Sequence, residues 1–118
     1  MYSVKVEGDF SSAHNLRGYK GKCEELHGHN WKVQIVVCKN TLDQTGMVAD
    51  FTSLKAELHK IIDRLDHKYL NNISYFKKFN PTSENIAKYI YDCLKNSISG
   101  LGSVTVWESQ NTRATYER

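Results

Sequence analysis

The chain has 118 residues, with 16 Lys and Arg against 13 Asp and Glu, and a formal net charge of +3 at pH 7. This length suits one domain with its own core and excludes a second one, so we expect a single domain over residues 1–118. The basic residues are spread along the chain, which argues against nucleic acid as the partner, although the small excess suits a ligand such as a phosphate ester.

The three cysteines, Cys23, Cys38 and Cys93, are odd in number and widely spaced. This argues against a disulfide framework and favours a reducing compartment. The first ten residues lack the apolar run of a signal peptide, and no window approaches the roughly 18 consecutive apolar residues of a membrane span. We therefore expect a cytoplasmic protein that does not bind membranes.

Alternating apolar and polar residues predict two strands in the first forty residues. The first begins at Tyr2 and the second contains Trp31. The loop between them, "NLRGYKGKCEELHG", is rich in glycine and basic residues, and functional residues often lie in such loops.

Helical spacing of apolar residues follows over 51–65 and again after Pro81. Asp50 is placed to cap the first helix, and Thr82 or Ser83 the second. After a break at "SGLGS", the segments "VTVWES" and "TRATYER" predict two closing strands. The apolar stripe of the first helix consists of Phe51, Leu54, Leu58, Ile61, Ile62 and Leu65, and that of the second of Ile86, Ile90, Cys93 and Leu94.

This β-β-α-α-β-β order predicts an α+β fold, a four-stranded antiparallel sheet with two helices on one face. The helices leave the other face uncovered. Because Trp31, Trp107 and several valines lie in the strands, we expect that face or its edges to be buried by oligomerisation.

Three histidines predict a metal site. His27 and His29 are two residues apart at a strand entrance, so their side chains point to the same side, and His14 ends the preceding antiparallel strand beside them. Three neutral imidazoles are typical of a catalytic zinc site with an open fourth position. His59 lies outside this cluster, on a helix, and is most simply a solvated surface residue.

The residue types alone allow two roles each for Cys23, for the pair Asp66 and His67, and for Glu108. The Cys23 thiol is either a fourth ligand that closes the site or a free thiolate that moves protons. Asp66 and His67 suit either a proton-transfer pair or a helix C-terminus. Glu108 is either a solvated strand end or an acceptor of two parallel hydrogen bonds from an amidine-like edge such as that of a pterin. Cys38 and Cys93 receive no role.

The chain resembles the 6-pyruvoyltetrahydropterin synthase and 6-carboxytetrahydropterin synthase family of tunnelling-fold enzymes. The resemblance runs over nearly the whole chain, through "FSSAHNL", "GKCEELHGHNW", "GMVADFTSLK", "LDHKYLN", "NPTSENIA" and "VWES" in that order. It implies one domain of this family, assembled as a homohexamer of two stacked trimers with sites at subunit interfaces.

The resemblance also implies roles for single residues. It implies that zinc is held by His14, His27 and His29, that Cys23, Asp66 and His67 form a proton-transfer triad, that Glu108 anchors the pterin ring, and that Thr82 and Ser83 line the pterin pocket. Contacts to the triphosphate of the substrate by Arg17, Lys20 and Lys22 are suggested only by charge and proximity.

A short chain and the three-residue gap between Cys23 and the HGH motif resemble the bacterial 6-carboxytetrahydropterin synthases. These convert dihydroneopterin triphosphate to 6-carboxytetrahydropterin, acetaldehyde and triphosphate in 7-deazaguanine (queuosine) biosynthesis. Two alternatives remain within the family: a pyruvoyl product, or a hydroxymethyl product for folate formed with Glu24, which otherwise is a solvated loop acid. The alternative outside enzymes is a closed zinc module in which Cys23 joins the three histidines.

Overall fold

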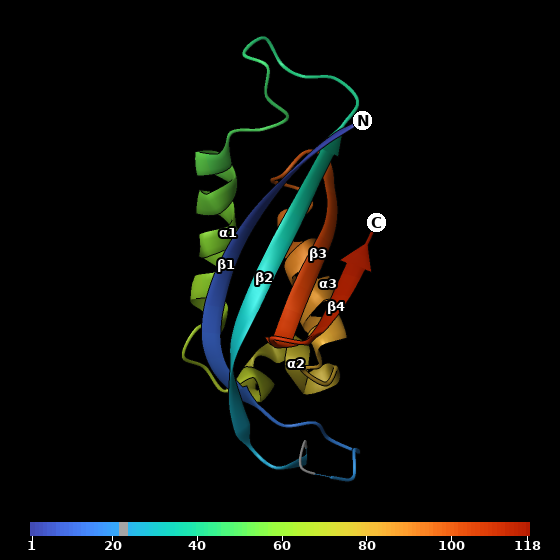
Figure 1. Cartoon of the computed structure of the whole chain (residues 1–118). Coiled ribbons are helices and arrows are strands. Elements are labelled where there is room, and N and C mark those ends of the chain that lie inside the picture. The colour runs from blue at the N-terminus through green and yellow to red at the C-terminus, as the bar shows by residue number, and fades with distance from the viewer. Residues whose placement is uncertain (22–23) are drawn as a thin grey trace.

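The computed structural model describes residues 1–21 and 24–118 and shows the predicted α+β architecture (Figure 1). Four antiparallel strands form one sheet in the order β1-β2-β3-β4, and two long helices lie on one of its faces, α1 against β1 and α3 against β3 and β4. The long elements are β1 (Tyr2–His14), β2 (His27–Lys39), α1 (Phe51–Leu65), α3 (Ser83–Leu94), β3 (Leu101–Ser109) and β4 (Thr112–Glu117).

The structure adds two short elements between the long helices, η2 (Leu70–Asn72) and α2 (Ser74–Lys78). Neither is long enough for a helical period to appear in the sequence. The predicted break at residues 99–103 is also too long, because β3 already begins at Leu101. The turn before β3 ends at Gly100, which has φ +81°. Within the described ranges, no helix is long and apolar enough to cross a membrane.

Both predicted helix caps are present. The Asp50 carboxylate accepts from the Thr52 N–H at the start of α1, and the Thr82 hydroxyl accepts from the Asn85 N–H at the start of α3. The predicted stripe of α1 is buried except for Phe51, which is 52% exposed beyond the edge of the sheet. These caps and stripes set where the helices begin and which side faces the sheet.

The face of the sheet under the helices holds the core, and Trp31 belongs to it with no exposed surface. The expectation that Trp31 contributes to the open face is therefore wrong, because the alternation places the odd-numbered residues of β2 inward. The open face is mostly polar. There Trp107 lies between the Lys32 ammonium, 4.6 Å from its ring, and the Arg113 guanidinium, 5.4 Å away.

The chain after α1 returns to the outer edge of β1. The His67 N–H donates to the Ser11 carbonyl at 2.6 Å, the Ala13 N–H donates to the Lys68 carbonyl at 3.0 Å, and Ala13 forms a parallel bridge with Tyr69. His67 takes the left-handed conformation at φ +54° to make this turn. The last part of the β1 edge is thus covered by the same chain.

Candidate metal centre

The three predicted ligands meet at the end of the sheet where β1 ends and β2 begins. His14 pairs with His27, and Ser12 pairs with His29, so the register brings all three imidazoles together. Glu108, at the end of β3, joins them: one ligand atom from each of the four side chains lies within 4.8 Å of the others. The position of Glu108 among the histidines could not be predicted from local sequence patterns, because it depends on the pairing of β2 with β3.

Two backbone carbonyls fix the orientation of the rings. The Nδ1 of His14 donates to the Pro81 carbonyl and the Nδ1 of His27 donates to the Glu25 carbonyl, each at 2.7 Å. These bonds keep the proton on Nδ1 and leave Nε2 with its lone pair. The two Nε2 atoms are only 3.0 Å apart. Two lone pairs at that distance require a positive charge between them, either a proton or a metal ion.

The environment of His29 also indicates that a positive charge belongs among these rings. Its Nε2 is buried and has no hydrogen-bond partner among the described residues. It lies 3.2 Å from Oε1 of Glu108, but out of line for a hydrogen bond, and the same oxygen is 3.3 Å from Nε2 of His14. A buried polar atom without a partner costs about 1–3 kcal/mol. A tetrahedral ion with nitrogen and oxygen ligands at about 2.0–2.1 Å separates its ligand atoms by roughly 3.3 Å. The cluster therefore fits a metal ion.

Burial favours the uncharged form of the ligands. It lowers the pKa of His14 below its usual value of 6.5, and the neighbouring His27 lowers it further, while the Pro81 and Glu108 oxygens act in the opposite direction. Burial likewise lowers the pKa of His29, partly offset by Glu108. A metal ligand must be a neutral imidazole, so this environment prepares both rings for an ion at neutral pH.

Trp31 forms the wall behind the histidines. Its ring meets those of His14 and His29 edge to face, with centroids 4.8 and 5.1 Å apart, and stacks with Phe10 at 5.9 Å. Its indole N–H donates to the Ser12 carbonyl at 3.2 Å. The wall keeps water from one side of the cluster and restricts the rotation of two ligand rings.

Asp66 and His67 form the predicted acid and imidazole pair, with Oδ2 of Asp66 2.9 Å from Nδ1 of His67. The other Asp66 oxygen accepts the Ser11 N–H at 2.8 Å. These hydrogen bonds, that of Ser11 first and that of His67 second, lower the pKa of Asp66. The pair lies on the outer edge of β1, however, and does not belong to the histidine cluster in the described part of the chain. The His67 side chain is 83% exposed.

The remaining predicted site residues lie near the same end of the sheet. Thr82 and Ser83 follow Pro81, whose carbonyl holds His14, and the Thr82 hydroxyl also caps α3. Glu24 is exposed, and its carbonyl accepts from the Asn15 side chain at 3.3 Å. Cys23 lies outside the described residues.

The basic residues of the loop are also partly placed. The Arg17 guanidinium donates to the Phe76 carbonyl at 2.6 Å, and Lys20 is exposed, whereas Lys22 lies outside the described residues. His59 is exposed on α1, as predicted.

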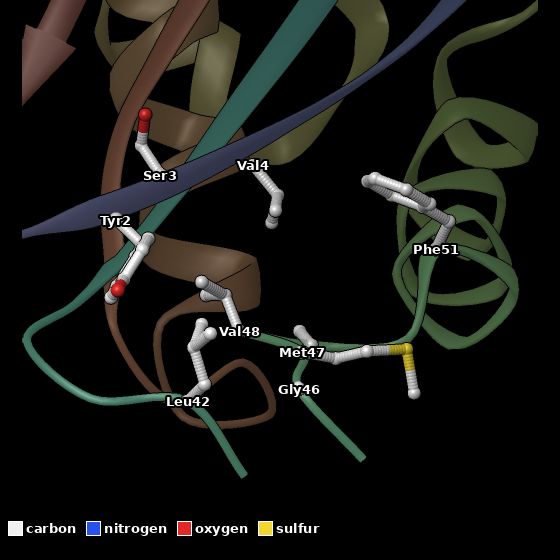
Figure 2. Close-up of a pocket in the computed structure, with 9 residues that line it drawn as sticks. Tyr2, Ser3, Val4, Leu42, Gly46, Met47, Val48 and Phe51 are labelled. Atoms are coloured by element: carbon white, nitrogen blue, oxygen red, sulfur yellow. The ribbon is translucent and has the colours of Figure 1, made fainter.

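An apolar groove of about 270 Å³ lies at the opposite end of β1 (Figure 2). Val4, Leu42 and Val48 project into it, and Met47 and Phe51 form part of its rim. It has no charged lining residue among those described, so it does not suit a polar, multiply charged substrate. The chemistry of this chain is gathered at the histidine end.

Comparisons with known proteins identify the family of this chain. The family model for 6-pyruvoyl tetrahydropterin synthase matches residues 3–118. A protein from Synechocystis named 6-carboxy-5,6,7,8-tetrahydropterin synthase is 39% identical, covering 98% of this chain and 93% of the relative. One of the same name from Haemophilus influenzae is 30% identical and covers 99% of both. The solved 6-pyruvoyl tetrahydropterin synthase of Caenorhabditis elegans superposes with a TM-score of 0.91 at 31% identity, over 99% of this chain and 95% of that one. This chain therefore belongs to the 6-pyruvoyl tetrahydropterin synthase family.

Proposed function

We propose that this protein is a zinc-dependent lyase that converts 7,8-dihydroneopterin triphosphate and water to 6-carboxy-5,6,7,8-tetrahydropterin, acetaldehyde and triphosphate, a step towards 7-deazaguanines. The observation that carries the proposal is the convergence of three imidazoles whose Nε2 atoms face a common point. The carboxy product is favoured by the names of the Synechocystis and Haemophilus influenzae relatives.

His14, His27 and His29 are the proposed zinc ligands, and three are enough to leave a position open. When bound, zinc supplies a Lewis acid that lowers the cost of negative charge on the substrate oxygens. Glu108 is then free to accept two parallel hydrogen bonds from the amidine-like edge of the pterin ring. Its position 3.2–3.3 Å from two ligand nitrogens would hold the ring beside the reacting side chain. Thr82 and Ser83 are proposed to line the same pocket.

Proton transfer falls to Cys23, Asp66 and His67 in this proposal. The Cys23 thiolate removes a carbon-bound proton of the substrate, and His67, oriented by Asp66, exchanges protons on its other side. Asp66 and His67 lie on the β1 edge rather than in the histidine cluster of their own chain. We therefore propose that a neighbouring copy brings this pair to the cluster, in a homohexamer built as a dimer of trimers.

The groove of Figure 2 supports association between copies. It combines an edge strand with exposed apolar side chains, namely Tyr2, Leu42, Met47 and Phe51, and such surfaces are usually covered. Sedimentation velocity should give a hexamer for the native chain. The variant Met47→Glu should shift it towards smaller species and reduce turnover, while zinc content per chain stays the same. A native monomer with full activity would contradict the assembly.

The deciding experiment is to incubate the zinc-loaded protein with dihydroneopterin triphosphate, without a reductase, and to identify the products by mass spectrometry. Carboxytetrahydropterin with acetaldehyde supports the proposal, and Cys23→Ala should lose this activity while keeping zinc. A pyruvoyl product, as the name of the Caenorhabditis elegans structure suggests for that protein, would change the product but keep the site.

Two further results would redirect the proposal. A hydroxymethyl product that disappears in Glu24→Ala would assign the protein to folate synthesis, and an unchanged product ratio in that variant would remove Glu24 from the mechanism. No turnover, together with a sulfur neighbour at about 2.3 Å from zinc by X-ray absorption, would instead indicate a closed zinc module in which Cys23 is the fourth ligand.

A further inference from the structure

Two asparagines to which the proposed chemistry gives no role make paired contacts beside the histidines. Asn71, in "LDHKYLN", is 7% exposed. Its Oδ1 accepts the Asn15 N–H at 3.0 Å, and its Nδ2 donates to the Asn15 carbonyl at 2.9 Å. Asn80, in "NPTSENIA", does the same for Arg17, at 3.0 and 2.8 Å. Each side-chain amide thus satisfies both backbone polar groups of one residue.

These contacts replace a missing strand. The β1–β2 ladder ends at the pair of His14 with His27, so residues 15–17 have no strand partner. The backbone groups of Asn15 are partly buried and those of Arg17 are exposed, and neither residue finds hydrogen-bond partners in the sheet. The two asparagines supply them from 56 and 63 residues away in the sequence. The backbone that follows His14 is therefore held by hydrogen bonds beyond the last residue of β1.

Asn80 also belongs to the turn that holds the His14 ring. Its carbonyl accepts the Thr82 N–H at 2.8 Å and the Asn85 side-chain amide at 2.9 Å. The next carbonyl, that of Pro81, accepts Nδ1 of His14. The turn at residues 80–82 thus contacts the imidazole of His14 and, three residues along, the backbone of Arg17.

We infer that Asn71 and Asn80 are positioning residues for His14. We call the four hydrogen bonds from these side chains to the backbone of residues 15 and 17 the clasp. The clasp keeps the His14 ring on the Pro81 carbonyl and its Nε2 directed at His27 and His29. This inference rests on the proposed function, because the group positioned is a proposed metal ligand. A ligand set that is ordered before the ion arrives loses less conformational freedom on binding, so the clasp raises metal affinity.

The test uses Asn80→Asp and Asn71→Asp. Each variant keeps the oxygen that accepts the backbone N–H but places a second oxygen opposite the backbone carbonyl, so half of the clasp is lost at constant volume. The control is Asn72→Asp, which adds the same charge at an exposed residue next to Asn71. An added negative charge by itself strengthens cation binding, so a loss of affinity cannot come from the charge.

Three quantities are measured on the full chain with Co²⁺ as the probe: affinity by competition with a chelator, the visible spectrum of the bound ion, and hydrogen exchange of the Asn15 and Arg17 amides without metal. We expect roughly tenfold weaker Co²⁺ binding, near the lower end for outer-shell partners. A changed spectrum and faster exchange of the amide beside the altered clasp should accompany it. Asn72→Asp should bind Co²⁺ at least as tightly as the native protein and match its spectrum and exchange rates.

Unchanged affinity and spectrum in an Asn80→Asp protein that folds, by circular dichroism, would overturn the inference while leaving the metal site in place. If the native protein binds no Co²⁺, the proposed function fails instead, and the exchange rates still decide whether the clasp exists. Should the variant of the buried Asn71, Asn71→Asp, fail to fold, the variant of the partly buried Asn80 provides the test.

Discussion

The two ends of β1 show how one strand serves two purposes. On its inward face, Val4 lines the apolar groove and Phe10 fills the core, whereas Ser12 and His14 bring polar atoms to the far end. At the groove end the side chains of Tyr2, Leu42, Met47 and Phe51 are exposed. At the histidine end Ser12 and His14 are buried, and backbone carbonyls accept hydrogen bonds from the Nδ1 atoms of His14 and His27. The difference teaches that a buried polar cluster needs a scaffold of hydrogen bonds, while an apolar surface needs only a partner to cover it.

The strongest way to break this comparison is to remove a proposed ligand. His27→Ala should abolish tight zinc binding and reduce turnover below detection, because only two of the three proposed ligands, His14 and His29, remain to hold the ion. Metal analysis and the mass-spectrometric product assay measure this. His59→Ala, an exposed histidine on α1, is the matched control and should behave as the native protein. Normal zinc content in His27→Ala would rule out the proposed ligand set.

Substitution of the two tryptophans tests how much the buried Trp31 ring behind the histidines contributes to stability, compared with Trp107 on the open face. Trp31→Ala should lower the free energy of unfolding by about 3–5 kcal/mol, since a large buried ring is lost. Trp107→Ala, on the open face between two cationic side chains, should cost about 1 kcal/mol. Urea denaturation of both variants gives the values. Equal losses would mean that the open face is packed as tightly as the core.

The two helix caps allow the two ends of the molecule to be compared with substitutions that should cause the same loss of stability. Asp50→Ala, next to the groove, and Thr82→Ala, next to the histidines, should each lower stability by about 1 kcal/mol. Only Thr82→Ala should also lower turnover, because the Thr82 backbone adjoins the carbonyl that holds His14. Denaturation curves and kinetic assays on the same preparations separate the two effects. An equal decrease of turnover in Asp50→Ala would show that activity follows stability alone.

The smallest expected effect is on pH dependence. In the metal-free protein the pKa values of His14 and His29 lie below 6.5, so the unfolded chain takes up protons before the folded one does. Stability should therefore fall as the pH decreases from 6.5 towards the folded-state pKa values. His14→Gln should flatten this slope in denaturation curves at several pH values, and His59→Gln should not. A slope of opposite sign would mean that the folded protein stabilises the protonated imidazoles.

Much of the fold follows from local patterns. The alternation from Tyr2 and around Trp31 predicted β1 and β2, and the caps Asp50 and Thr82 predicted the start of each long helix. The short elements η2 and α2 were not predicted, because three and five residues are too few to show a helical spacing of apolar residues. Trp31 has the same odd-numbered spacing as the buried Val33 and Ile35, so the alternation that predicts β2 places it on the core face, and the expectation for the open face did not apply this rule.

The site was predictable where it depends on one hairpin. The spacing of His27 and His29, and the place of His14 at the adjoining strand end, were enough to predict that the three rings meet. Glu108 was missed as a member of the cluster because it arrives through the pairing of β2 with β3. Pro81 was missed as the holder of His14 because a backbone carbonyl acts without regard to its side chain. The contacts of Asn71 and Asn80 were also missed, because their partners are backbone groups 56 and 63 residues away in the sequence.

The parallel bridge between Ala13 and Tyr69 has a consequence for assembly. It blocks the β1 edge near its end, so an incoming strand can hydrogen-bond only alongside the part that starts at Tyr2 and must stop before Ser11. A strand as short as the six residues of β4 would otherwise be able to slide along the thirteen of β1. The bridge therefore acts as an end stop that limits the registers in which a neighbouring molecule can dock, and it does so with the same few residues that carry Asp66 and His67.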